Sequence, residues 1–157
     1  MSARPGPCGG PSAMVVPTAI SQSIPSRILH GKTLPPLHRR MMEYLLVLND
    51  SPYGSQRTYN ALRLAAALAK SATTEVSIFL LGDGVVSGLR MQSPADASYN
   101  VQEMLRLLAA QGVSIGACRT CLEARGIDDA SLVAGINRRT LDDLRNWTEE
   151  ATKVLVF

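Results

Sequence analysis

The chain has 157 residues, of which 46% are hydrophobic and only 4% aromatic. This length suits one domain with a buried core, and the composition favours an aliphatic α/β interior. No apolar run approaches the roughly 20 residues of a transmembrane helix, so no membrane association is expected. Three cysteines are too few for the disulfide framework of a small secreted protein, and we expect a cytoplasmic protein with reduced thiols.

The formal net charge of +3 is distributed unevenly along the chain. Residues 1–42 contain five of the 16 basic residues and none of the 13 acidic ones, so the rest of the chain is slightly acidic. Nucleic-acid-binding domains cluster Lys and Arg with stacking aromatic side chains, and no such cluster follows residue 42. The sequence therefore predicts no nucleic-acid partner.

Residues 1–41 are expected to form a disordered leader. Seven of the nine prolines lie there, without the apolar periodicity of a packed element. These prolines break the amphipathic helix of an organelle transit peptide, and the apolar run before Pro17 is too short for a secretory signal. A translation start at Met41 or Met42 is the simpler interpretation, which leaves one α/β domain at residues 42–157.

The chain after the leader alternates strand and helix patterns, which favours right-handed parallel crossovers. Strands are expected at 43–48, 75–81, around 113–115, around 132–136 and at 153–157; helices are expected at 56–70, 100–111 and from Thr140, with a short helix and loop within 85–99. The inward stripes are expected at Tyr59, Leu62, Ala66 and Ala69 in the first helix and at Leu141, Leu144, Trp147 and Ala151 in the last. The predicted fold class is α/β, a three-layer α/β/α domain with a mostly parallel sheet of about five strands.

Two polar loops follow the first and third predicted strands. Ligands of parallel α/β sheets gather at the carboxyl ends of the strands, where both loops lie. The first loop, residues 49–55, ends with Tyr53, Gly54 and Ser55 directly before a helix, and the second covers residues 118–126. Strand order decides whether the two loops adjoin.

The second loop contains two thiols, Cys118 and Cys121, where the third strand is expected to become a short helix that ends at Gly126. The N–H groups and dipole of a helix N-terminus lower a thiol pKa below about 8.5, and Arg119 and Arg125 would add positive charge. Side chains at i and i+3 share a helix face, so the thiols could exchange a disulfide. The alternative is that both are small buried hydrophobic residues, as free cysteines usually are.

The sequence predicts no metal site and no cofactor. Structural zinc sites use four ligands, and a single C-x-x-C supplies only two. The only histidines, His30 and His38, lie in the leader.

Three segments in this order resemble the DsrE-like family, in particular its YchN branch. They are Asn-Asp-Ser-Pro-Tyr-Gly-Ser at 49–55, the cysteine segment at 118–126 and the ending Trp147 to Phe157. Leu-Arg at 89–90 and Tyr-Asn-Val-Gln at 99–102 fit the same pattern. The resemblance extends from about residue 42 to residue 157, and only the leader departs from it.

The resemblance implies a five-stranded α/β/α domain that assembles into trimers or hexamers. Some members relay sulfur as a cysteine persulfide, for tRNA thiolation or in sulfur oxidation, which implies a sulfurtransferase-like carrier with sulfur donor and acceptor proteins. The relay cysteine there stands at the end of the third strand ahead of an Arg-Gly pair, and Cys118 with Arg125 and Gly126 matches it. Cys121 is typical of the YchN branch, whose activity the resemblance leaves open.

Cys118 is therefore the expected nucleophile, which attacks the outer sulfur of an incoming persulfide. Cys121 would release sulfide by closing a disulfide, or would stabilise the bound sulfur. Thr120 would donate a hydroxyl hydrogen bond to that sulfur or act as an ordinary cap.

Two other functions stay open. The protein would be a small-molecule or nucleotide-binding subunit if Tyr53, Gly54 and Ser55 form an anion site at a helix N-terminus, although the Gly-rich Lys-Ser/Thr motif of a phosphate-binding loop is missing. It would be an assembly protein without sulfur transfer if its tyrosines only pack in an interface.

Overall fold

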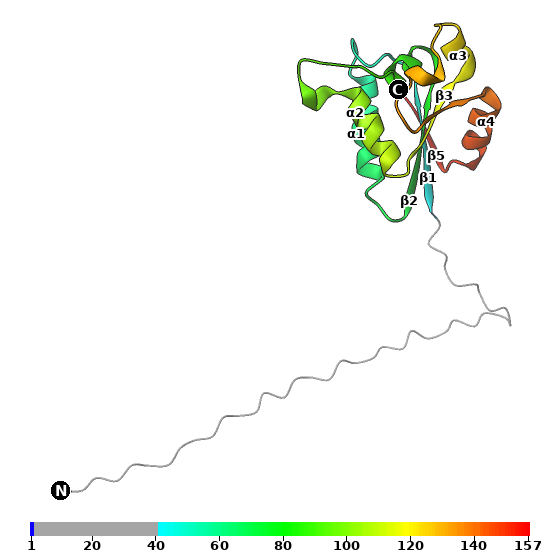
Figure 1. Cartoon of the computed structure of the whole chain (residues 1–157). Helices are drawn as coiled ribbons and strands as arrows, with labels where there is room; N and C mark the ends of the chain where they lie inside the picture. The colour runs from blue at the N-terminus through cyan, green and yellow to red at the C-terminus, as the bar shows by residue number, and fades with distance from the viewer. Residues whose placement is uncertain (2–40) are drawn as a thin grey trace, which may run out of the picture. The chain divides into compact units, whose positions relative to one another are not determined.

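The computed structural model describes Met1 and residues 41–157 (Figure 1). The leader expected at 1–41 thus lies almost entirely outside the described residues. The strands are β1 (Met42–Leu48), β2 (Thr74–Leu80), β3 (Ser114–Cys118), β4 (Ile136–Arg139) and β5 (Lys153–Val156). The α-helices are α1 (Arg57–Leu68), α2 (Val101–Ala110), α3 (Arg119–Glu123) and α4 (Leu141–Glu150), and short 3₁₀ helices are η1 (Gly82–Gly88), η2 (Ala97–Tyr99) and η3 (Asp129–Ser131).

The five strands form one parallel sheet in the order β4-β3-β2-β1-β5. Helices α1 and α2 lie on one face of this sheet and α4 lies on the other, with α3 at the carboxyl ends of the strands (Figure 1). The prediction of a three-layer α/β/α fold is confirmed. Because β2 separates β1 from β3, the two polar loops follow strands that are not neighbours.

The core is aliphatic, as the low aromatic content predicts. The last four residues of β1 and most of β2 are buried on both faces, and Leu105 and Leu108 of α2 close one side of the sheet. Each such Leu or Ile side chain contributes about 1.5–3 kcal/mol when it leaves water. The continuous apolar runs of the sequence thus correspond to strands covered from both sides.

The buried face of α1 differs from the predicted stripe. Its fully buried residues are Thr58, Ala61, Leu62 and Ala65. Of the predicted stripe, Leu62 is fully buried and Ala66 and Ala69 are partly buried against the core, whereas Tyr59 lies outside it. The Thr58 hydroxyl donates to the Asp50 carbonyl at 2.7 Å, which holds this face against the end of β1. A polar residue anchors the helix at a position where apolar periodicity gives no signal.

The last helix follows its predicted stripe except at Leu141, because Leu144, Trp147 and Ala151 pack against the core. Leu141 is 58% exposed because it is the first residue of α4, and no residue of α4 is fully buried. Trp147 packs edge-on against Phe79 of β2, with ring centroids 5.9 Å apart, and Leu144 packs against the core beside it. The helix starts after Thr140 as expected, and a capping box forms there, since the side chains of Thr140 and Asp143 accept hydrogen bonds from each other's backbone N–H.

The fourth strand begins at Ile136, whereas the apolar pattern placed it at 132–136. Leu132 and Val133 are buried without belonging to the sheet, because Leu132 forms an isolated antiparallel bridge with Leu89. Gly135, with φ of +92°, then turns the chain into the strand. The true strand, Ile-Asn-Arg-Arg, is a polar edge strand, which hydrophobic patterning cannot detect.

Candidate functional site

The cysteine segment lies at the junction of strand and helix, as predicted. Cys118 is the last residue of β3 and the N-cap of α3, and Cys121 lies in α3. The strand continues past the expected 113–115 because Gly116 leaves room beneath α4. A Cβ at Gly116 would lie 2.9 Å from Arg139 Cγ and 3.2 Å from a ring carbon of Trp147.

The cysteine segment ends at Gly126, as the sequence predicts. Gly126 has φ of +63°, the left-handed conformation that favours glycine. Its position lets the Ile127 N–H reach back to the Leu122 carbonyl at 3.0 Å. This turn fixes α3 as a five-residue helix that starts at the thiols.

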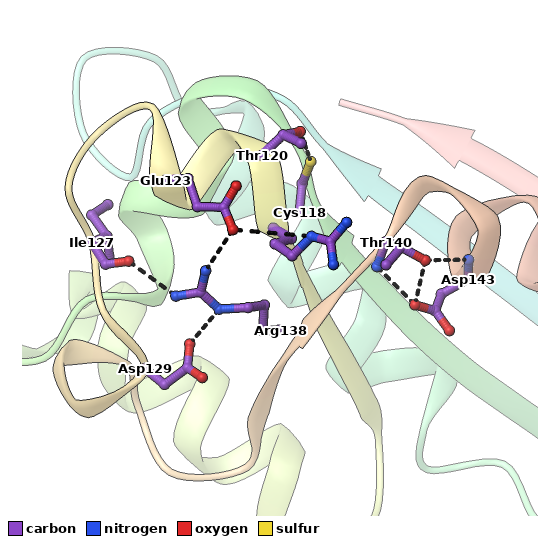
Figure 2. Close-up of polar contacts among 9 residues, drawn as sticks. Cys118, Thr120, Glu123, Ile127, Asp129, Arg138, Thr140 and Asp143 are labelled. Atoms are coloured by element: carbon purple, nitrogen blue, oxygen red, sulfur yellow. Dashed lines mark hydrogen bonds and ion pairs between the residues drawn. The ribbon is translucent and has the colours of Figure 1, made fainter.

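Cys118 is only 2% exposed, and its Sγ lies 3.3 Å from the Thr120 hydroxyl (Figure 2). Burial raises the pKa of this thiol. Hydrogen bonds from the Thr120 hydroxyl, the Cys121 thiol and the backbone N–H groups of both residues oppose burial, and the pKa of Cys118 ends below its usual value. The site therefore favours a thiolate at Cys118.

Cys121 is shifted in the opposite direction. Burial and the hydrogen bond to Cys118 raise its pKa, while the Gly82 N–H, which donates to Sγ at 3.3 Å, and the Arg125 charge oppose the rise. The net pKa is above the usual value. The two thiols are thus unequal, because the pKa of Cys118 is lowered and that of Cys121 is raised.

The two arginines do not lower the pKa of Cys118, although the sequence led us to expect this. Arg125 pairs with Asp83 of η1 and donates to the Cys121 carbonyl at 3.0 Å, so it acts on Cys121. Arg119 extends towards Glu123, with Nε 4.0 Å from the carboxylate. Hydrogen bonds, not the arginines, lower the pKa of Cys118.

Arg138 of β4 holds the end of α3 in place, and the sequence analysis did not identify it. Its guanidinium donates to Asp129 at 2.7 Å, to Glu123 at 3.4 Å and to the Ile127 carbonyl at 3.3 Å (Figure 2). Only a quarter of the side chain is exposed. The sequence signal for Arg138 is an arginine near the carboxyl end of an edge strand. This signal can be recognised only when the bounds of that strand are known.

A pocket of about 250 Å³ opens at Cys118, between the starts of α3 and α4. It is lined by Cys118, Arg119, Thr120, Thr140, Leu141 and Asp142. The pocket exists because β3 and β4 are neighbours, so that the helices that follow them begin side by side. The sequence alone did not predict that β3 and β4 are neighbours.

The structure leaves the turn at residues 53–55 apart from the thiols. Ser55 donates its hydroxyl to Asp50 at 2.7 Å, and Tyr53 donates to Gln92 Oε1 at 2.8 Å. The Tyr53 ring packs on Tyr99 of η2 at 5.9 Å. Among residues 41–157, no hydrogen bond joins this turn to the cysteine segment. Cys121 instead contacts Gly82, which follows β2. The sequence signal for Gly82 was its place at the carboxyl end of a strand that neighbours β3.

Within the part of the chain that the structure describes, no three His, Cys, Asp or Glu side chains are grouped as metal ligands. In the same part, every helix is too short or too polar to cross a membrane.

The model of the DsrE/DsrF-like family matches residues 42–157. The chain belongs to this family. Protein YchN of Escherichia coli strain K12 is 42% identical over 118 residues, which are 74% of this chain and all of YchN. The crystal structure of the E. coli ychN protein superimposes with a TM-score of 0.70 at 41% identity, over 74% of this chain and all of that one. A sulfurtransferase TusD homologue of Vibrio vulnificus strain CMCP6 is 34% identical over 87 residues, 55% of this chain and 66% of that protein.

Membership of the DsrE/DsrF-like family confirms the resemblance predicted from the three segments. The matched range begins at the first residue of β1 and ends with the chain, so it includes both cysteines and the pocket. The likeness to YchN also supports the sheet, since YchN is matched over its whole length.

Proposed function

We propose that this DsrE/DsrF-like protein is a cytoplasmic sulfur carrier that holds sulfur as a persulfide on Cys118. The observation that carries the proposal is the inequality of the two thiols, because a relay needs one thiolate that attacks and holds sulfur. The TusD homologue, a sulfurtransferase by name, supports the same activity. Such a carrier requires partners that donate and accept sulfur.

The loading step transfers one sulfur atom. The Cys118 thiolate attacks the outer sulfur of a donor persulfide, a new S–S bond forms on Cys118, and the donor leaves as a thiolate when its own S–S bond breaks. In the unloading step, an acceptor thiolate attacks the outer sulfur and Cys118 leaves as the thiolate. The Thr120 hydroxyl supports both steps by donating to the charged Cys118 sulfur.

Cys121 decides between two fates of the loaded sulfur. As a resolving thiol, it attacks the Cys118 sulfur, closes a disulfide and releases sulfide. As a protonated donor, it holds the persulfide until an acceptor arrives. Its raised pKa favours the second fate at neutral pH, and Arg125 and Gly126 hold the helix end that places it.

Intact mass after incubation with a persulfide donor tests the proposal. Cys8 is first changed to Ser, so that only the two site thiols remain. We expect a sulfur-sized increment in this protein and in Cys121→Ser, and none in Cys118→Ser. Loading of Cys118→Ser alone, or of no variant with any donor, would contradict the proposal.

The anion-binding alternative gains no support from the turn at 53–55. An anion there would face the Asp50 carboxylate, which already accepts the Ser55 hydroxyl. The negative charges of Asp50 and of a bound anion would repel each other, so the turn does not favour a phosphate.

We further propose that the domain forms a closed homo-oligomer, a trimer or a hexamer. The edge strand β5 supports this, since Val154 and Val156 are 40% and 67% exposed beside an unpaired strand edge. Light scattering at micromolar concentration should give a mass of three or six chains. A monomeric mass would contradict the proposal.

A further inference from the structure

Access to Cys118 restricts the kind of donor that can deliver sulfur. The residue is 2% exposed and lies at the pocket between α3 and α4. The pocket volume, about 250 Å³, is below the roughly 300–1,000 Å³ of sites for drug-sized ligands. A donor must therefore place its persulfide inside a small pocket, which favours a donor of low molecular weight.

The two charged side chains that line this pocket have the weakest partners in the site. Arg119 is 55% exposed and reaches Glu123 only at 4.0 Å, while Arg138 lies closer to the same carboxylate at 3.4 Å. Asp142 has no hydrogen bond or ion pair among the described residues, whereas its neighbour Asp143 is occupied by the capping box. A weakly paired cation and a carboxylate with no partner among the described residues thus line the pocket.

We propose that the pocket binds a free α-amino-acid persulfide, with the donor's carboxylate at Arg119 and its ammonium group at Asp142. This inference rests on the proposed function of Cys118 and names its substrate class. A zwitterion of this size matches the pocket in charge and volume. The exposed side chain of Leu141 offers an apolar wall for the donor's methylene group.

Bound in this way, the donor presents its outer sulfur to Cys118. The Cys118 thiolate forms the new S–S bond, the donor's S–S bond breaks, and the free amino acid leaves with a thiolate sulfur that takes a proton from water. No oxidant or reductant is needed, because one sulfane sulfur only changes its partner thiol.

Four donors that differ only in charge test the inference on the Cys8→Ser protein. They are the persulfides of cysteine, mercaptopropionate, cysteamine and mercaptoethanol, which carry both charges, the carboxylate, the ammonium group and neither. We expect Arg119→Gln to slow loading of Cys118 from the first two by about tenfold and to leave the cysteamine donor unchanged. Asp142→Asn should slow the cysteine and cysteamine donors and spare mercaptopropionate.

The matched controls are Arg145→Gln and Glu149→Gln, which remove the same charges from exposed positions of α4 outside the pocket. Both should load like the parent protein with every donor. Equal effects of the control and pocket variants, or loading rates that ignore the donor's charge, would overturn the inference while leaving the sulfur carrier intact.

A binding measurement separates failure of the site from failure of sulfur transfer. S-methylcysteine, which cannot donate sulfur, should slow alkylation of Cys118, and both Arg119→Gln and Asp142→Asn should weaken this protection. Protection without loading from any donor would refute the sulfur carrier and keep the amino-acid site. Loading without protection would overturn the site alone, and absence of both would overturn both.

Discussion

Two strand-to-helix turns at the carboxyl edge of the sheet differ in what they offer a ligand. The turn after β1, at residues 53–55, points its Ser55 hydroxyl at the Asp50 carboxylate and its Tyr53 hydroxyl at Gln92. The junction after β3 directs hydroxyl, thiol and backbone donors at one buried sulfur, Cys118. The comparison shows that entry into a helix does not by itself create a reactive site. Donors must converge on an atom that has no other partner.

The segment that follows β2 lies between these turns and contacts the chain on both sides. Gly84 of η1 packs against the end of β1, and Gly82 donates its N–H to Cys121. Damage to η1 should therefore affect both turns, whereas damage within one turn should leave the other intact.

The largest expected effect is that of Gly84→Ala. A Cβ here would overlap the Leu48 carbonyl oxygen and lie 2.8 Å from its carbon, so backbone would have to move. We expect a loss of about 2–4 kcal/mol in the free energy of unfolding, measured with urea. Gly54→Ala is the control, since its Cβ meets open space and only the φ of +112° is strained. It should cost about 1–2 kcal/mol. An equal loss in both variants would mean that η1 does not support the turns.

Thr120→Val should have the next largest effect, confined to the junction after β3. Valine keeps the shape of threonine but cannot donate to the Cys118 sulfur, so the pKa of Cys118 should rise towards its usual value. Alkylation of Cys118 at pH 7 should slow by roughly several-fold, the equivalent of one hydrogen bond of about 1 kcal/mol.

Ser55→Ala is the matched control in the other turn. It removes a hydroxyl from a similar strand-to-helix position but leaves the surroundings of Cys118 unchanged. Cys118 in this variant should be alkylated at the same rate as in the parent protein. Slower alkylation of Cys118 in Ser55→Ala, or unchanged alkylation in Thr120→Val, would contradict the proposed difference between the two turns.

The smallest expected effect is that of Tyr53→Phe. The variant loses the 2.8 Å part-buried hydrogen bond to Gln92 but keeps the ring contact with Tyr99, so stability should fall by about 0.5 kcal/mol. Urea unfolding measures this loss, and sulfur loading on Cys118 should not change. Reduced loading would show that the turn after β1 takes part in the site.

Much of the fold was predictable because local patterns and burial agree along most of the chain. The apolar runs of β1 and β2 and the helix start at Thr140 were predicted correctly, as was the place of Cys118 at the end of a strand. The wrong boundary of β4 has a physical cause. Leu132 and Val133 are buried by packing outside the sheet, and the polar strand that follows is held by pairing to β3.

The surroundings of the cysteines were less predictable, because they depend on which strands are neighbours. Gly82 meets Cys121 because β2 lies beside β3, and the pocket forms because β4 lies on the other side. The expected effect of Arg119 and Arg125 on the pKa of Cys118 is missing for a local reason, since Arg119 lies beside Glu123 and Arg125 pairs with Asp83.

The alkylation rate of each thiol as a function of pH tests the central claim most directly. It is measured for Cys118 alone in Cys8→Ser/Cys121→Ser and for Cys121 alone in Cys8→Ser/Cys118→Ser, where serine keeps a hydroxyl in place of the missing thiol. Donors to the thiolate lower the pKa of Cys118, so its rate should rise at a pH below the value of about 8.5 for a free cysteine. Burial still raises the pKa of Cys121 without Cys118, so its rate should rise at a higher pH than that of Cys118. An unshifted Cys118, or a Cys121 that reacts at lower pH than Cys118, would contradict the account.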